Sequence, residues 1–264
     1  MTSTVELYYC EACEQEVKGH HRFCHNCGSY LGDDGTRVSV FNNHNMRAAF
    51  VFIIVYLFVC LMVQFTNWFD SYSMLFWVEI FLASFTLFHV IKNFDAIKPL
   101  LKFNNFNAVR LTGCISLAVI ASLIVNILVT KFNYSFFNSD TTYYSRYSVY
   151  ALPAVVMIYS IALNPAIFEE LAFRGVLYNY LNSFLDERLV VIVTGFTFGI
   201  MHLSFISLLW LVPFGILVGA MRKRFGTIWY GVIFHFTFNL IAVLFDLYRH
   251  GLLNGLRVMD CMIG

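Results

Sequence analysis

The chain has 264 residues and a formal net charge of +1, so its overall charge points to neither an acidic nor a basic partner. Hydrophobic residues make up 59% of the sequence and charged residues only 12%, which is about half the charged fraction of a soluble domain. This composition excludes an ordinary soluble globular protein. It favours helices that cross a membrane, each of which needs about 20 mostly apolar residues.

The N-terminal module is rich in cysteine and reads CEACEQEVKGHHRFCHNCG, with Cys-x-x-Cys pairs at Cys10 and Cys13 and at Cys24 and Cys27. Two such pairs have the spacing of a structural zinc site, in which four thiolates hold one tetrahedral Zn²⁺. The metal would supply the folding energy that so short a module cannot obtain from a core. Two disulfides are the alternative, but they are rare in a reducing cytoplasm. We therefore expect a structural Zn²⁺ in a zinc ribbon over residues 1–31.

Long apolar runs fill the region after a polar linker over residues 32–46. They cover residues 48–69, 71–91, 111–130, 147–168, 189–221 and 225–245. The run over 189–221 is long enough for a hairpin of two crossings. We therefore predict an all-α polytopic membrane domain over 47–247, followed by a short C-terminal tail over 248–264.

The basic residues between the apolar runs predict the topology. They lie at Arg37 and Arg47, at Lys92, Lys98, Lys102 and Arg110, and at Arg222, Lys223 and Arg224. The positive-inside rule places the N-terminus and these loops in the cytoplasm. That requires residues 148–188 to cross only once, as a long helix that Asn164-Pro165 breaks. We predict seven crossings, or eight if 148–163 and 165–185 cross separately.

Three charged residues interrupt the apolar stretch NPAIFEELAFRG, and ionisable groups inside a membrane span are costly unless they have a task. On a helix, Glu170 and Arg174 are four residues apart with the acid first, which is the favourable order for an ion pair. Glu169 faces another direction and has no partner in its own segment. We therefore expect Arg174 to neutralise Glu170 and leave Glu169 free to act.

Two further polar pairs lie in the C-terminal half. FTFGIMH places Phe198 and His202 four residues apart, and HFTFN does the same for His235 and Asn239. Glutamate and histidine can activate a water as general bases, and histidine and asparagine can donate hydrogen bonds to an oxyanion. Because no serine or cysteine sits in a nucleophile motif, attack by water on a carbonyl is the reaction that these residues favour.

The motifs EExxxR, FxxxH and HxxxN, in this order on successive apolar segments, resemble the CPBP family. These are the CAAX proteases and bacteriocin-processing enzymes, also called the Abi family, and some members carry an N-terminal zinc ribbon. The resemblance covers a motif core over residues 148–247. It rests on Glu169, Glu170, Arg174, Phe198, His202, His235 and Asn239.

The resemblance implies an intramembrane endopeptidase with a water-filled cavity open to the cytoplasm. It assigns catalysis to Glu169, Glu170, Arg174, His202, His235 and Asn239. By this resemblance Glu169 and His202 activate water, while His235 and Asn239 stabilise the oxyanion. A catalytic zinc held by the two histidines and Glu169 is an alternative, but we favour a metal-free mechanism because glutamate and histidine suffice as acid and base.

The expected partners are the lipid bilayer and a membrane-associated peptide or protein substrate, whose identity the motifs leave open. A prenylated CAAX protein, a peptide pheromone and a bacteriocin precursor are the options that the family offers. The competing hypothesis is a non-catalytic membrane scaffold that binds a partner such as a sensor kinase, with the ribbon as one contact. The ribbon's mixed charge does not indicate a nucleic-acid site. A transporter would need internal repeats, and we see none.

Overall fold

The computed structural model describes residues 7–18, 21, 23–32, 43–103, 107–138, 143–150 and 153–252. This part of the chain is mostly helical and contains a small antiparallel sheet of β1 (Leu7–Tyr9) and β2 (Glu16–Lys18), in which Tyr8 lies opposite Val17. The sheet belongs to the cysteine-rich module. The predicted all-α fold class with a small separate N-terminal module is therefore confirmed.

The helices follow the predicted apolar runs closely. Their bounds are α1 (His44–Phe65), η2 (Asn67–Phe69), α2 (Tyr72–Lys92), α3 (Phe94–Ile97), η3 (Lys98–Leu101), α4 (Ala108–Phe137), α5 (Tyr143–Tyr147), η4 (Ser148–Tyr150), α6 (Ala154–Ile158), η5 (Tyr159–Leu163), α7 (Asn164–Glu169), η6 (Glu170–Leu177), α8 (Tyr178–Asn182), α9 (Glu187–Met201), α10 (Leu208–Phe225) and α11 (Trp229–Arg249). Side-chain N-caps from Asn43, Ser71, Asn107 and Asp186 start four of them by accepting hydrogen bonds from the first free backbone N–H groups.

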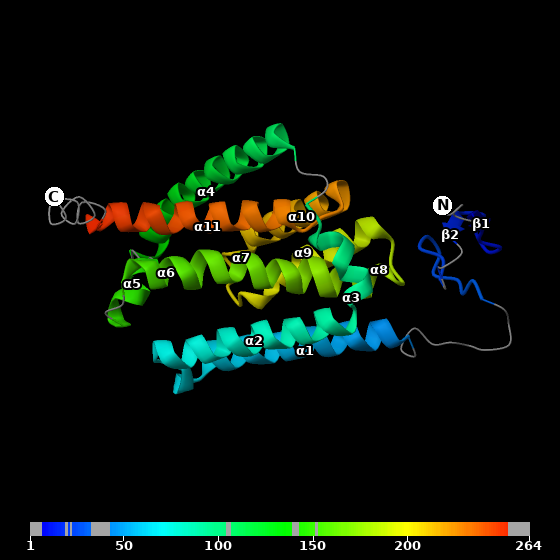
Figure 1. Cartoon of the computed structure of the whole chain (residues 1–264), viewed down its shortest axis with the longest axis horizontal. Helices are drawn as coiled ribbons and strands as arrows, with labels where there is room; N and C mark the ends of the chain where they lie inside the picture. The colour runs from blue at the N-terminus through cyan, green and yellow to red at the C-terminus, as the bar shows by residue number, and fades with distance from the viewer. Residues whose placement is uncertain are drawn as a thin grey trace.

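Five helices in the described residues are long and apolar enough to cross a membrane: α1, α2, α4, the continuous helix 154–182, and α11. The hairpin expected over 189–221 forms as α9 and α10, but α9 has only 15 residues. It is about 22 Å long, which is shorter than the roughly 30 Å hydrocarbon layer. Figure 1 shows the turn between α9 and α10 partway along the bundle. The total of seven crossings stays a prediction.

The expected break at Asn164-Pro165 is wrong, because α6, η5, α7, η6 and α8 follow one another without interruption. Two of these segments, η5 and η6, are π-helical. In an α-helix the carbonyl of Ile161 would accept from the N–H of residue 165, but proline has none. The side-chain amide of Asn239 in α11 donates to this carbonyl instead, at 2.8 Å. The helix therefore continues through the proline. The alternative of eight crossings requires two separate helices in this segment.

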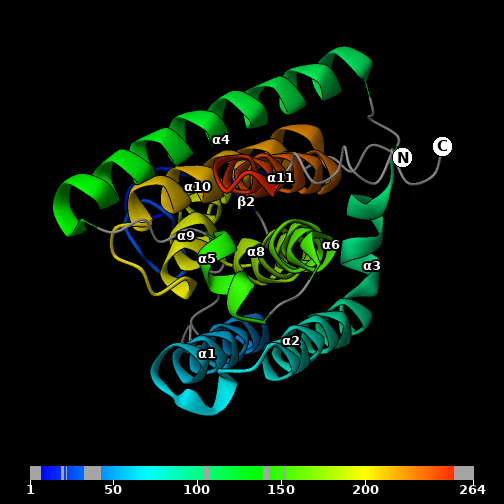
Figure 2. The same cartoon turned by 90° about the vertical axis from the view of Figure 1, so that its left-hand side faces the viewer.

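This long helix is the centre of the bundle. Figure 2 shows α1 and α2 on one side of it, α9, α10 and α11 on the other, and α4 outermost beyond α11. Burial separates the inner from the outer helices: 17% of the most apolar stretch is buried in each of α1, α2 and α4, against 44% in the central helix and 50% in α11. The peripheral helices therefore keep most of their apolar surface for lipid.

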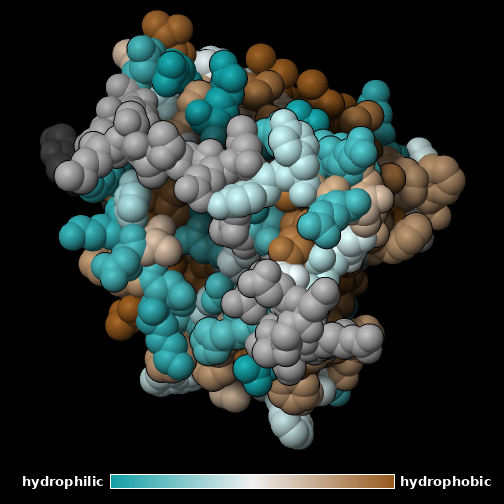
Figure 3. All heavy atoms as spheres, turned by 90° about the vertical axis from the view of Figure 1, so that its right-hand side faces the viewer, coloured by the Kyte–Doolittle hydropathy of each residue, from teal (hydrophilic) through white to brown (hydrophobic). Residues whose placement is uncertain are grey.

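The basic segments gather at one end of the bundle. Figure 1 places the start of α1, the end of α2, α3, the start of α4 and the end of α10 at the same end as the cysteine module. Figure 3 looks at this end and shows many hydrophilic side chains on it. The arrangement is the one that the positive-inside rule requires for a cytoplasmic N-terminus, although that orientation stays a prediction.

Glycines allow α9 and α10 to pack closely. A Cβ built on Gly195 would lie 2.7 Å from the backbone N of Ile216, and one built on Gly215 would lie 2.8 Å from the Cα of Gly195. These distances are well below van der Waals contact, so neither position accepts a larger residue without a shift of the backbone. Small residues at such crossings are typical of helix pairs in membranes.

We predict that Gly195→Ala destabilises the membrane domain by about 1–3 kcal/mol, because the added methyl group overpacks the crossing. Gly113→Ala in α4 is the matched control, since a Cβ there meets nothing within 4 Å. Thermal unfolding in detergent measures both variants. A Gly195→Ala variant as stable as Gly113→Ala would contradict the close packing of α9 and α10.

Candidate active site and metal centre

A fully buried ion pair anchors the candidate active site. Arg174 Nη1 donates to Glu170 Oε1 at 3.0 Å, and neither side chain is exposed. The second guanidinium nitrogen, Nη2, donates to the carbonyl of Gly215 in α10 at 3.0 Å, and the guanidinium lies 4.7 Å from the centre of the Phe198 ring. The predicted pairing of Glu170 with Arg174 is confirmed.

His235 of α11 joins this pair from the other side. Its Nδ1 lies 3.0 Å from Glu170 Oε1, and its ring packs against Phe198 and Phe214. Because an ionised carboxylate only accepts hydrogen bonds, Nδ1 must carry the proton, and in a neutral ring Nε2 is then a free acceptor. Nε2 lies 4.0 Å from Glu169 Oε2. His235 thus stands between the two adjacent glutamates.

Glu169 differs from Glu170 in being partly exposed. Its side chain is 31% accessible, and its Oε2 makes no hydrogen bond within the described residues. The side chain of Glu169 lines a cavity of about 250 Å³. The cavity is lined by Tyr56, Cys60, Glu79, Leu82, Ala83, Ser160, Asn164, Pro165, Phe168, Glu169, Phe173, Met201 and His202.

His202 lines the same cavity from the C-terminal end of α9. Its side chain is exposed, and its Nδ1 lies 2.9 Å from the carbonyl of Phe198. A carbonyl can only accept, so Nδ1 donates and Nε2 of the neutral ring is free to accept a proton. The spacing of Phe198 and His202 therefore fixes the imidazole through a backbone hydrogen bond as well as through contact of the two rings, whose centroids are 5.0 Å apart.

The structure thus brings five of the six predicted catalytic residues into direct contact or into one cavity. Glu170, Arg174 and His235 form a hydrogen-bonded group, and Glu169 approaches His235 while sharing the cavity with His202. Asn239 points to the central helix, where its amide donates to the Ile161 carbonyl. Its predicted contact with an oxyanion is not tested by this arrangement.

Glu79 of α2 is a site residue that the sequence motifs do not include. Its carboxylate lines the cavity and accepts a hydrogen bond from Asn164 Nδ2 at 3.0 Å. The sequence carried one signal for it, because Glu79 is the single formal charge in the apolar run over 71–91 and charges inside a span are rarely idle. Its place in the cavity depends on how α2 packs against α7, which the sequence does not reveal.

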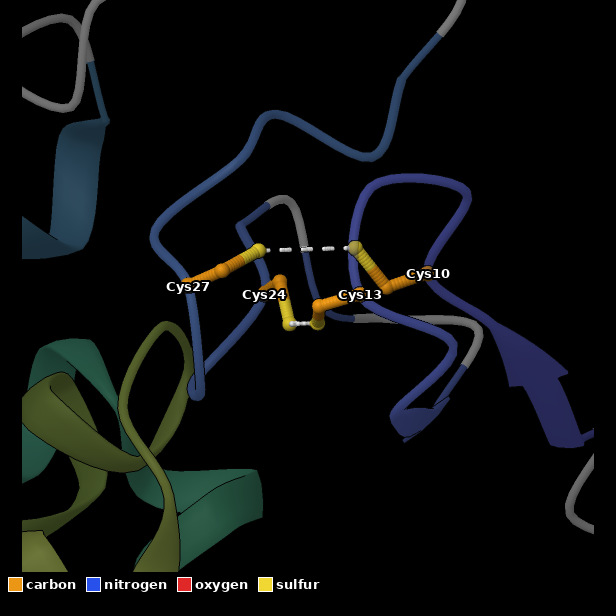
Figure 4. Close-up of side chains that lie close together, drawn as sticks. All are labelled: Cys10, Cys13, Cys24 and Cys27. Carbon is orange, nitrogen blue, oxygen red and sulfur yellow. Dashed lines mark hydrogen bonds between the residues drawn. The ribbon is translucent and has the colours of Figure 1, made fainter.

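The four cysteines of the N-terminal module converge. Their sulfurs lie within 4.8 Å of one another, with 3.6 Å between Cys10 and Cys27 and 3.5 Å between Cys13 and Cys24. Figure 4 shows the four side chains directed toward a common centre. A Zn–S bond of about 2.3 Å implies tetrahedral sulfurs about 3.8 Å apart, so this cluster fits a zinc ion. Within the described residues it is the single group of three or more potential metal ligands found.

The two Cys-x-x-Cys pairs repeat the same backbone turn. The N–H of Cys10 donates to the carbonyl of residue 15, and the N–H of Cys24 donates to that of residue 29. The carbonyls of the same two cysteines accept from the N–H of Glu14 and Gly28, which both have positive φ, 57° and 75°. Glycine adopts this conformation without strain, which explains why Gly28 follows the second pair.

Hydrogen bonding and burial separate the cysteine pKa values. Burial raises the pKa of Cys10 to about 11, whereas the hydrogen bond with Ser29 lowers the pKa of Cys27 to about 6. A metal ion binds the thiolate form, so its binding must displace the proton from Cys10. Four thiolates would complete a tetrahedral shell and leave no position for substrate or water, so an ion bound here would be structural.

Comparison with known families supports the resemblance seen in the motifs. Residues 151–241 match the family model described as type II CAAX prenyl endopeptidase Rce1-like. This part of the chain is therefore similar to Rce1-like endopeptidases. The match runs from the start of the central helix into α11 and includes all six predicted catalytic residues. Comparisons with curated proteins and with solved structures found no match.

We predict that the protein binds one zinc ion per chain, which elemental analysis of the purified protein will measure. Cys24→Ser should remove the metal because three thiolates and a weak hydroxyl ligand do not complete the site. Cys60→Ser, which lies outside the module, is the matched control and should retain one zinc. Equal zinc content in the two variants would show that the cluster is not the zinc site.

We further predict that Arg174→Ala lowers stability by roughly 3–5 kcal/mol, because it leaves the buried Glu170 charge without its cation. The double variant Glu170→Gln/Arg174→Ala should recover much of this loss, since a glutamine oxygen still accepts from His235. Thermal unfolding in detergent compares the two variants. An equal or larger loss in the double variant would contradict a stabilising pair.

Proposed function

We propose that the membrane domain is an intramembrane endopeptidase that hydrolyses a peptide bond with a water activated by Glu169 and His202. The observation that carries this proposal is that the two adjacent acids have different surroundings. Glu170 is fully buried and held by Arg174 and His235, whereas the side chain of Glu169 is 31% exposed and lines a cavity that also contains His202. The match of residues 151–241 to a protease family supports the same reaction class.

In the proposed reaction Glu169 takes one proton from water as the water oxygen adds to the carbonyl carbon of the substrate. The resulting tetrahedral intermediate collapses when the bond from carbon to nitrogen breaks and the amine leaves. Glu169 passes its proton to His202 Nε2, which the hydrogen bond to Phe198 leaves as the free nitrogen, and the resulting imidazolium gives the proton to the amine as the bond breaks. The Glu and His pair therefore supplies both the base and the acid that peptide hydrolysis requires.

His235 and Asn239 are the proposed donors to the oxyanion. A neutral His235 has no proton on Nε2, because Nδ1 donates to Glu170. We infer that His235 donates as the imidazolium, with a carboxylate on each side of the ring to balance its charge. Asn239 has a second amide hydrogen beyond the one given to Ile161. The hydrogen bonds from both donors would then strengthen as negative charge develops on the carbonyl oxygen of the substrate.

The substrate of this site is proposed to be a membrane-associated peptide or protein. The cavity lies among helices with apolar outer surfaces, and its walls combine aromatic and aliphatic side chains with a few polar groups. The matched family is described as a type II CAAX prenyl endopeptidase, and a prenylated CAAX protein is one candidate substrate. We also propose that the cysteine module over 1–31 and the linker over 32–46 are a separate cytoplasmic unit.

Glu169→Gln should abolish proteolysis, with a loss of at least about 100-fold, because glutamine has the same shape but cannot take a proton from water. Comparison of peptide termini in membranes that contain the wild type or the variant measures turnover and identifies the substrate. Glu187→Gln makes the same change at a partly exposed acid that pairs with Lys223 outside the cavity. It should keep wild-type activity, whereas near-wild-type turnover by Glu169→Gln would refute the assignment.

Deletion of residues 1–35 separates the two metal hypotheses in the same experiment. The truncated protein should lose its zinc and still hydrolyse a small peptide in detergent. If it instead keeps a stoichiometric metal that Glu169→Ala removes, then Glu169, His202 and His235 are metal ligands and the metal-free mechanism is wrong.

A further inference from the structure

The mechanism above leaves one cavity carboxylate without a task. Glu79 lies in the middle of α2, and its side chain is partly buried. It accepts a hydrogen bond from Asn164 Nδ2 at 3.0 Å, and Ser160 lines the same cavity. No lysine, arginine or histidine of the described residues lies within ion-pair distance of it. A carboxylate in this setting is costly unless it has a function.

The other membrane-embedded acids of the site have cationic neighbours. Glu170 is paired with Arg174, and His235 lies beside both Glu170 and Glu169. Glu79 has the neutral amide of Asn164 as its donor instead, and this holds its carboxyl group at the cavity wall without supplying a cation. The cavity therefore contains a carboxyl group that is separate from that of Glu169 and has no cationic partner among the described residues.

The distance from this group to the reacting centre follows from the central helix. Asn164, which holds Glu79, precedes Glu169 by five residues, and five residues of α-helix rise about 7.5 Å. An extended peptide spans about 3.3–3.6 Å per residue. A substrate lying along the central helix with its scissile bond at Glu169 would place the side chain about two residues away beside Glu79.

We propose that Glu79 is a specificity residue that binds the ammonium or guanidinium group of a lysine or arginine about two residues from the scissile bond. The inference rests on the proposed peptidase function and adds the class of substrate to it. The basic side chain supplies the cation that the described residues do not, and its long aliphatic stem suits the apolar walls formed by Leu82, Ala83 and Phe168.

A purely structural role for Glu79 predicts a different outcome. Hydrogen bonds between polar side chains often hold membrane helices together, and Glu79 joins α2 to the central helix in this way. Glutamine at this position still accepts from Asn164, so Glu79→Gln preserves the link between the helices and removes only the charge. A structural residue would then leave the choice of substrate unchanged.

The test measures cleavage of synthetic apolar 14-residue peptides by the full-length protein in detergent micelles, followed by mass spectrometry. Each sequence is made in two forms that differ at one position, with lysine or with acetyl-lysine, which has the same stem and no charge. We scan this position along the peptide. At the position about two residues from the cleavage site, the wild type should cleave the lysine form at least about tenfold faster.

In Glu79→Gln this preference should fall to within about twofold while the acetyl-lysine form is cleaved at nearly the wild-type rate. Glu79→Asp, which keeps the charge, should restore part of the preference. Equal cleavage of both forms by the wild type would overturn the specificity role, as would an equal loss for both forms in Glu79→Gln. If the wild type cleaves none of the peptides faster than Glu169→Gln does, the peptidase function itself is overturned.

Discussion

The buried carboxylate of Glu170 is the interaction on which the rest of the site depends. One of its oxygens accepts from Arg174 in its own helix and from His235 in α11, both at 3.0 Å. Arg174 extends the network to the carbonyl of Gly215 in α10. A charge with no exposed surface is stable in a membrane protein only when such partners satisfy it. The position of three helices is therefore coupled to one side chain.

This network also determines which of the two adjacent acids can do chemistry. Glu170 engages Arg174 and the Nδ1 of His235, so that Glu169 has only the Nε2 side of the same ring as a neighbour, at 4.0 Å. Glu169, unlike Glu170, has a partly exposed side chain beside the cavity that contains His202. The Nδ1 hydrogen bond to Glu170 moreover fixes the orientation of the His235 ring. The structural acid and the proposed catalytic acid are thus neighbours in sequence with different surroundings.

The central helix reaches this arrangement through irregular backbone. Pro165 withholds the donor that the Ile161 carbonyl needs, and the π-helical segments on either side of α7 change the direction in which later side chains point. Asn239 satisfies the Ile161 carbonyl from α11. Local π-helical geometry is often found at functional sites, and here it accompanies the segment that bears both glutamates.

The sequence by itself determined the features that depend on local spacing. Apolar runs gave the helices, two Cys-x-x-Cys pairs gave the convergent thiols, and the interval of four residues gave the pairing of Glu170 with Arg174, because side chains at that interval meet on one helix. The zinc ion, the catalytic roles and the orientation in the membrane remain proposals. The prediction of a helix break was wrong. The side chain that donates to the Ile161 carbonyl is Asn239, 78 residues away along the chain, and local spacing does not reveal such a contact.

Only the tertiary structure decided the contacts between distant helices. It placed His235 between Glu169 and Glu170, which lie on a helix more than 60 residues earlier in the chain. It also placed Glu79 in the cavity through Asn164, 85 residues away. A helical pattern states which residues share a face of one helix, but the rotation and depth of each helix against its neighbours follow from the packing of all of them. For that reason the sequence indicated the candidate catalytic residues, and the fold decided which of them face the cavity.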